Sequence, residues 1–183
     1  MKSVCCVVVI ALLSVSCGSP VSAPAPAASA PKPYGTLAQM MQAIPFPASN
    51  IIFDAQSEDP GAAKKPEGAA GAGTGKGAYD SVYGGWTAVE NAAVALSETA
   101  NLLMIPGRMC SNGKPAPLDR EDYKKAIAGL ADAGAAALKA AQKKDLDAIV
   151  EVSGTVTEAC SACHDVYREK DNLADRCTPP PAK

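Results

Sequence analysis

Apolar side chains recur at alternating steps of four and three residues between positions 82 and 103 of this 183-residue chain. Heptad spacing of this kind places the side chains along one side of an α-helix and requires other helices to cover them. The stretch therefore predicts a packed helix from about Asp80 to Met104, with Asp80 or Ser81 as its cap and Pro106-Gly107 as its stop. The seam consists of Val82, Trp86, Val89, Ala93, Leu96, Ala100 and Leu103.

Two later stretches have the same periodicity. Asp119 can cap the first of them, with Asp122 at the capping-box position in place of Glu, and Asp145 can cap the second. Small residues on the first seam would let a neighbouring helix or a flat cofactor approach closely. The first seam is Tyr123, Ile127, Leu130, Gly134, Ala137 and Ala141; the second is Leu146, Ile149, Ser153, Val156, Cys160, Cys163 and Tyr167.

A shorter seam of Leu37, Met41 and Ile44 predicts a first helix, which Pro45 and Pro47 then interrupt. Residues 50–54 either resume a helical turn or run extended. Aromatic residues make up only 4% of the chain and alanine is abundant, which favours closely packed helices over a β-sandwich. Four amphipathic helices joined by short polar links predict an all-α, antiparallel four-helix bundle.

The last seam runs through Cys160-Ser161-Ala162-Cys163-His164, which contains the only histidine of the sequence. C-x-x-C-H is the attachment signature of c-type haem. Thiols three residues apart on a helix point to one side, so both can add to the vinyl groups of one porphyrin, and His164 would be the proximal ligand of iron. A thioredoxin-like pair would need a βαβ context, and a zinc site would need a second pair of ligands. We therefore predict one covalent haem c that faces the core.

The N-terminal residues indicate export. Residues 1–16 have the pattern of a signal segment, because Lys2 is followed by an apolar run too short to span a bilayer. Around Cys17 the sequence resembles a bacterial lipobox, in which Cys17 would be lipidated and tether a soluble domain to a membrane surface. Val21-Ser22-Ala23 offers a competing, ordinary cleavage site. We expect a periplasmic protein and, of these two forms, favour the lipoprotein.

The remaining chain divides into a spacer, a domain and a tail. Residues 17–33, rich in Ala, Pro and Ser, predict a tether; residues 34–177 are the predicted bundle, and residues 178–183 its tail. Cys110 and Cys177 stay unassigned once the other cysteines are set aside. In an oxidising periplasm such a pair most simply forms a disulfide, which would tie the chain after the last helix to an interhelical loop. The alternative is two free buried thiols.

A four-helix bundle with C-x-x-C-H on its final helix resembles the class II cytochromes c, that is, the cytochrome c prime family and its low-spin relatives. The resemblance covers roughly residues 34–170, and its most specific part is the segment 160–168, which is similar to the family ending C-x-x-C-H-x-x-[FY]-R. In class I cytochromes c the motif lies near the N-terminus instead. The resemblance implies that Arg168 lies near His164 on one helix, as their i, i+4 spacing also predicts. The short first helix, the glycine-rich residues 59–77 and the spare cysteine pair depart from the family pattern.

The sixth coordination position of the iron decides the function. With no second histidine, the distal ligand is methionine, lysine, water or nothing, and Met/His ligation raises the potential of electron-carrying cytochromes. Met41 lies on the first seam, where low-spin relatives supply their methionine, whereas Met40 lies about 100° around the helix. Met104 and Met109 end a different helix. We predict electron transfer through iron held by His164 and Met41; the alternative is a five-coordinate iron that binds NO or CO.

The sequence also limits the partners. A formal net charge of −2 leaves no basic surface for nucleic acid. A haem enzyme would need a distal acid or base, a role that falls most often to histidine, so we expect no enzymatic activity. The resemblance implies a homodimer through the first two helices, and the redox partner is not given by the sequence. Contact with a membrane is expected only through the lipid anchor.

Overall fold

The computed structural model describes residues 30–62 and 83–178. The chain forms two units, Met1–Ala30 and Pro31–Lys183, and the helices and the cavity belong to the second of them. The predicted signal segment, Cys17, most of the tether, and the proposed caps Asp80 and Ser81 lie outside the described residues. None of the described helices has both the length and the apolar character that crossing a membrane requires.

Within these ranges the chain is helical, as the periodicity predicted. The only β-type contact in this part of the chain is an isolated bridge between Met109 and Pro115. The α-helices are α1 (Leu37–Ala43), α2 (Pro45–Asp54), α4 (Trp86–Leu103), α5 (Glu121–Lys143) and α6 (Leu146–Tyr167), followed by the 3-10 helix η1 (Leu173–Asp175). The all-α class and the bundle character are confirmed.

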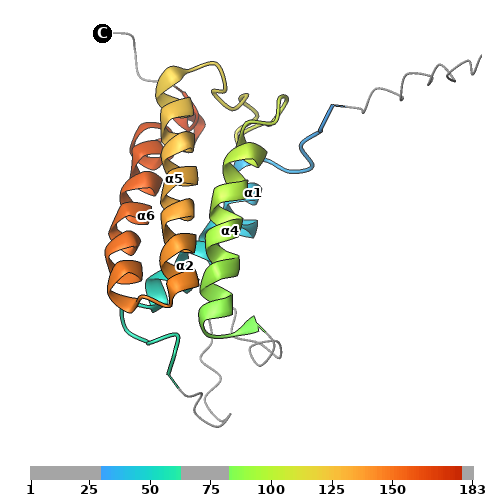
Figure 1. Ribbon diagram of the computed structural model, residues 1–183. Coiled ribbons are helices and arrows are strands. Elements are labelled where there is room, and N and C mark those ends of the chain that lie inside the picture. Colours follow the sequence, from blue (N-terminus) through green and yellow to red (C-terminus); the bar gives the residue numbers. More distant parts are fainter. Residues whose placement is uncertain (1–29, 63–82, 179–183) are drawn as a thin grey trace, which may run out of the picture. The chain divides into compact units, whose positions relative to one another are not determined.

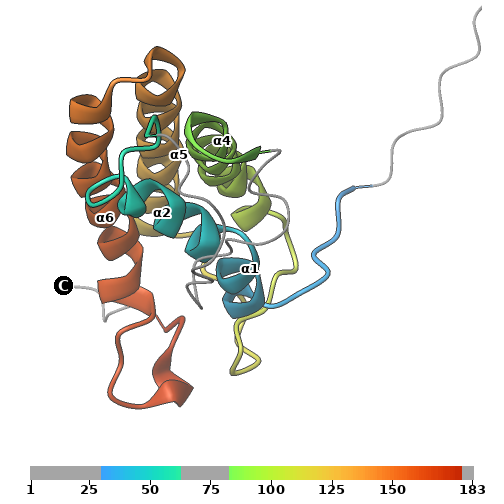
Figure 2. The same cartoon turned by 90° about the horizontal axis from the view of Figure 1, so that it is seen from below.

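Helix α5 packs against both α4 and α6, and these three helices lie side by side in Figure 1. Helix α2 packs against α4 and, over a smaller area, against α6. Figure 2 shows α2 between these two helices, with α1 continuing the same layer. The site described below therefore has long helices on one side and short helices on the other.

The predicted seams on α4, α5 and α6 supply much of the core, whereas Leu37, Met41 and Ile44 of the first seam are half-buried. Of the seam residues on α4, all but the half-buried Trp86 are buried, and every seam residue of α5 is buried. On α6 the seam is buried at Ile149, Ser153, Val156 and Tyr167, while Cys160 and Cys163 are half-buried. Gly134 lets α4 approach α5 closely, because a Cβ atom there would lie 2.5 Å from Ser97 Oγ. A neighbouring helix, rather than a flat cofactor, uses that small residue.

Two predicted helix starts are wrong. Helix α4 begins at Trp86 instead of near Asp80, because Gly85 precedes it with φ 63° in the left-handed region. A Cβ atom at Gly85 would lie 2.8 Å from the carbonyl oxygen of Pro60, so a glycine is required there. Helix α5 has Arg120 rather than Asp119 at its N-cap, and no side chain caps it. The Asp122 carboxylate instead accepts hydrogen bonds from Arg120 and Tyr167.

The first predicted helix continues after a one-residue break. Ile44 separates α1 from α2, and Pro45 then occupies the first turn of α2, where its missing N–H costs no helical hydrogen bond. Residues 50–54 are therefore helical, not extended. A capping box that the sequence analysis missed starts α1: the Thr36 hydroxyl accepts from Gln39 N, and Gln39 Oε1 accepts from Thr36 N.

Candidate functional site

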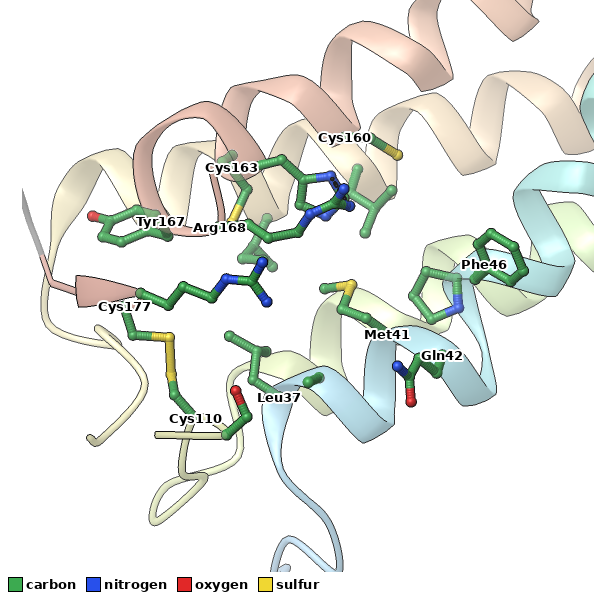
Figure 3. A pocket seen from close by; sticks show the side chains of 18 of the residues that line it. Leu37, Met41, Gln42, Phe46, Cys110, Cys160, Cys163, Tyr167, Arg168 and Cys177 are labelled. Carbon is green, nitrogen blue, oxygen red and sulfur yellow. Dashed lines mark hydrogen bonds between the residues drawn. A yellow bond between two sulfur atoms is a disulfide. The ribbon is translucent and has the colours of Figure 1, made fainter. Parts of the chain in front are cut away.

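A cavity of about 420 Å³ opens beside the C-terminal half of α6. All five residues predicted to bind the cofactor line it: Met41, Cys160, Cys163, His164 and Arg168. The bridged pair Cys110 and Cys177 lines it too, and Figure 3 shows this pair around the same space as Met41, Cys160, Cys163 and Arg168. Residues from α1, α2, α5, α6 and the chain after η1 thus meet at one site.

The proximal wall is the end of α6. The Asp145 side chain fixes the start of this helix, where its Oδ1 accepts from Ala148 N at 3.0 Å, as predicted. The thiols of Cys160 and Cys163 are free and half-buried. Burial raises the pKa of the Cys163 thiol to about 11 and also raises the pKa of Cys160. A redox dithiol needs a lowered pKa, so these neutral thiols do not fit the thioredoxin-like alternative.

The zinc alternative also lacks support. Across residues 30–62 and 83–178, no group of three or more His, Cys, Asp or Glu side chains could hold a metal ion. A structural zinc site needs four such ligands. The two thiols and the histidine on α6 therefore match the covalent attachment pattern better than a closed metal site.

Arg168 lies against the imidazole of His164. One guanidinium nitrogen, Nη1, is 3.1 Å from His164 Nδ1, and the Arg168 Nε pairs with the Glu169 carboxylate at 2.8 Å. Arginine is always a donor, so Nδ1 accepts in this contact and the neutral ring carries its proton on Nε2. Binding of iron at Nε2 would require that proton to leave Nε2, so the contact with Arg168 describes the ring without iron. Burial, and then Arg168, lowers the pKa of His164 and so favours the neutral imidazole that binds iron.

The distal wall comes from α1 and α2. Met41 is half-buried and extends from α1 into the cavity in Figure 3. Met40, Met104 and Met109, the other methionines of the described ranges, do not line the cavity. Apolar side chains of α5 complete the space between the two walls. The apolar lining includes Leu37, Phe46, Ala126, Ile127 and Leu130.

Arg108 fixes the chain at the start of α1. Its side chain is only 4% exposed, with Nη1 donating to the Gly35 carbonyl at 2.9 Å and Nη2 donating to the Leu102 carbonyl at 2.8 Å. The backbone N–H of Leu37 also donates to the Met109 carbonyl at 2.8 Å. These bonds tie the first turn of α1 to the chain after α4. They hold the distal wall in place, and the sequence analysis missed them.

The segment after α6 closes one end of the cavity. Cys110 and Cys177 form a disulfide with a Cα–Cα distance of 6.5 Å. The Cys177 N–H donates to the Tyr167 carbonyl at 2.9 Å, which joins this segment to the end of α6. Arg176 lines the cavity, and its Nε is buried without a hydrogen-bond partner. Sequence reasoning missed Arg176, although its position next to Cys177 already placed it near the haem motif.

The family model described as Cytochrome C' matches residues 117–168. The matched segment contains α5, α6 and Arg168, and it confirms the predicted resemblance to the class II cytochromes c. No curated protein and no solved structure matches the chain. The cofactor that the family implies is a covalently bound c-type haem with iron, and proteins of this family are typically periplasmic.

The residues around the cavity fit that cofactor. Two neutral thiols and one imidazole lie on the proximal wall, the lining between the walls is apolar, and one buried arginine nitrogen lacks an acceptor. Cys160 and Cys163 would hold the macrocycle and His164 the iron. When bound, the haem supplies one-electron chemistry or a binding position for a diatomic gas. The protein supplies the ligands, the orientation and the exclusion of water.

Proposed function

We propose that this protein is an electron-transfer cytochrome in which His164 and Met41 ligate the iron of a single haem c. The family match supports a c-type cytochrome. The observation that carries the finer proposal is that Met41 and His164 line one cavity from different helices, while the remaining described methionines lie elsewhere. A methionine opposite a histidine is the ligand pair that raises the potential of electron-carrying cytochromes.

Met41 would supply the second protein ligand of the iron beside His164. A small gas would then have no vacant position, and an electron would enter and leave without exchange of a ligand. The apolar lining formed by α1, α2 and α5 limits water around the iron, which is one of the factors that set its potential. In this function the protein changes little between the oxidised and the reduced form.

A second function is favoured by a different observation. Helix α1, which carries Met41, has seven residues and none of them is buried. A wall held mainly by its ends can move away from the iron more easily than one buried along its length. The iron would then be five-coordinate, and the apolar space beside Met41 would bind NO or CO.

The optical spectrum of the haem-loaded protein separates the two functions. We expect a sharp, split visible band and a methionine–iron charge-transfer feature, with no change on addition of CO. Met41→Ala should remove that feature and create a CO-binding site. Met40→Ala is the matched control and should keep the original spectrum, because Met40 does not line the cavity. A broad, high-spin spectrum that responds to CO in the unmodified protein would support the gas-binding alternative instead.

We further propose that the bundle is antiparallel and that the protein works in the periplasm. The two-residue link of Lys144 and Asp145 between α5 and α6 supports opposite directions of these helices. Lipidation of Cys17 would anchor the domain, and replacement of Cys17 by serine should then move it from the membrane fraction to the soluble fraction. The Cys110–Cys177 disulfide fits an oxidising compartment.

The proposed protein is a carrier and not an enzyme. Its single histidine is used as the proximal ligand, so no histidine is left to act as a distal acid or base. Its partner would be another redox protein that docks close enough to the haem for an electron to pass. A homodimer through the first two helices is the assembly that the family resemblance implies, and sedimentation of the haem-loaded protein would test it.

A further inference from the structure

The cavity contains a guanidinium group that has no acceptor. Arg168 and Arg176 both line it, and no aspartate or glutamate is among the described residues around it. Arg168 already pairs through its Nε with the Glu169 carboxylate. Arg176 makes no ion pair with the described chain, and its Nε is buried without a hydrogen-bond partner. A buried donor of a charged group is costly unless an acceptor is bound, so this position points to an anionic ligand.

The backbone around Arg176 is held on several sides. The next residue, Cys177, is joined to Cys110 by the disulfide and donates its N–H to the Tyr167 carbonyl. The Asn112 side chain donates from Nδ2 to the carbonyl of Arg176 at 2.8 Å and to that of Ala174 at 3.0 Å. An arginine on a segment restrained in this way loses little further backbone freedom when it binds a ligand.

The cofactor of the family supplies a matching anion. Haem carries two propionate groups in addition to the two vinyl groups that the thiols use, and a planar guanidinium matches the geometry of a carboxylate. We propose that Arg176 binds a haem propionate and that the Cys110–Cys177 disulfide positions it to do so. This inference concerns how the haem is held, and it stands whether or not Met41 binds the iron.

The first test replaces Arg176 in the haem-loaded protein. Arg176→Gln removes the cation but keeps a polar side chain, and the infrared bands of haem labelled with ¹³C at the propionates report the contact directly. The carboxylate band of one propionate should shift to the frequency of a water-exposed group. The reduction potential should also fall, because a cation near the iron favours the less positive, ferrous form. A propionate band that does not move in this variant would overturn the proposal.

Lys170→Gln is the matched control. It removes the same formal charge from the same C-terminal segment, but Lys170 does not line the cavity. It should leave the propionate bands unchanged and lower the potential by less than Arg176→Gln does. Arg176→Lys gives a second comparison, because it keeps the positive charge but loses the planar guanidinium that can donate two parallel hydrogen bonds to a carboxylate. Relative to Arg176→Gln, this variant should bring the reduction potential closer to that of the unmodified protein than it brings the infrared band.

The role of the disulfide is tested by repeating the Arg176 substitution in a protein that lacks the disulfide. The double variant Cys110→Ser with Cys177→Ser should shift the same propionate band, and adding Arg176→Gln should then change it little further. Reduction of the disulfide in the unmodified protein should give the same shift if a variant fails to fold, with circular dichroism as the check. A full Arg176→Gln effect in the unbridged protein would show that the disulfide does not position Arg176.

Discussion

The two walls of the cavity are built in different ways. The proximal wall is the end of α6, a helix of 22 residues that packs along α5 and has buried seam residues on both sides of the half-buried Cys160 and Cys163. The distal wall belongs to α1 and α2, of 7 and 10 residues, and α1 buries none of its side chains. Burial along a face holds the proximal side chains, whereas bonds at the ends of segments hold the distal ones.

This difference assigns a separate role to each part of the chain. The long helices place the thiols and His164 by packing that is continuous with the core. Met41 depends on the hydrogen bonds of Arg108 and on the capping box of Thr36, and Arg176 depends on the disulfide. We therefore infer that the attachment of the haem tolerates surface changes that would alter the distal ligand or the propionate contact.

The largest expected effect comes from removing buried side chains on the helices that carry the two walls. Ile149 in α6 and Ile52 in α2 are both fully buried, so they form a matched pair. We expect Ile149→Ala to lower the free energy of unfolding by about 2–5 kcal/mol, and Ile52→Ala by less, because a short helix can collapse further into the space left. Urea unfolding of both variants measures the difference. An equal or larger loss at Ile52 would mean that the distal wall is as firmly packed as the proximal one.

The next effect comes from removing the Cys110–Cys177 disulfide, which closes one end of the cavity. Replacing Cys110 and Cys177 together by serine should lower the free energy of unfolding by about 2–4 kcal/mol, because the open chain gains freedom in the unfolded state. Native-state hydrogen exchange should accelerate first at the Cys177 and Leu37 amides, whose bonds lie beside the bridge. Amides in the middle of α5 should keep their protection. Uniform acceleration along the chain would contradict the distinction between the two walls.

The sequence predicted the proximal wall well because its signals are local. Heptad spacing in α4, α5 and α6 depends on residues three or four apart, and C-x-x-C-H is contained in a single turn and a half of helix. Met41 was predicted from its position on a seam of three residues, and the structure places it in the cavity. Its binding to iron, like the lipidation of Cys17, stays a prediction.

The rest of the site was missed because its contacts join residues far apart in the chain. Arg108 reaches Gly35 across 73 positions, and Asn112 reaches Arg176 across 64. Helical periodicity in the sequence relates residues three or four apart, so it cannot predict such pairs. The start of α4 was missed for the same reason, since the close approach of Gly85 to the carbonyl of Pro60 joins residues far apart in the chain. At α5, the Asp122 carboxylate accepts a hydrogen bond from Tyr167 of another helix instead of completing the capping box with Asp119 that a local pattern suggested.

A smaller effect tests the packing between the long helices. A Cβ atom at Gly134 would lie 2.5 Å from Ser97 Oγ and 2.7 Å from Ser97 N, so Gly134→Ala must push α4 away from α5. We expect a loss of about 1–3 kcal/mol in the free energy of unfolding. Gly129→Ala in the same helix meets nothing within 4 Å and should stabilise by about 0.5–1 kcal/mol. Equal effects of both substitutions would show that the helices are not in close contact at Gly134.

The smallest effect depends on pH and lies where α5 meets the end of α6. Arg120, and next Tyr167, donate hydrogen bonds that hold the pKa of the Asp122 carboxyl well below its usual range. A carboxyl with a lowered pKa in the folded state stabilises the fold above its unfolded pKa of about 4, and this contribution is lost as the pH falls further. The stability advantage of the unmodified protein over Asp122→Asn should therefore be present at pH 6 and shrink towards pH 2.

Urea unfolding of both proteins across this pH range measures that advantage. Asp132→Asn, at an exposed aspartate of the same helix that makes no ion pair with the described residues, is the control and should show little change with pH. Because Asp122 is at the surface and its ion pair with Arg120 is screened by solvent, the whole effect should remain below those of the core, disulfide and glycine variants. A difference that stays constant from pH 6 to pH 2 would mean that the carboxylate charge contributes nothing, and that only the hydrogen bond from the buried Tyr167 joins the two helices there.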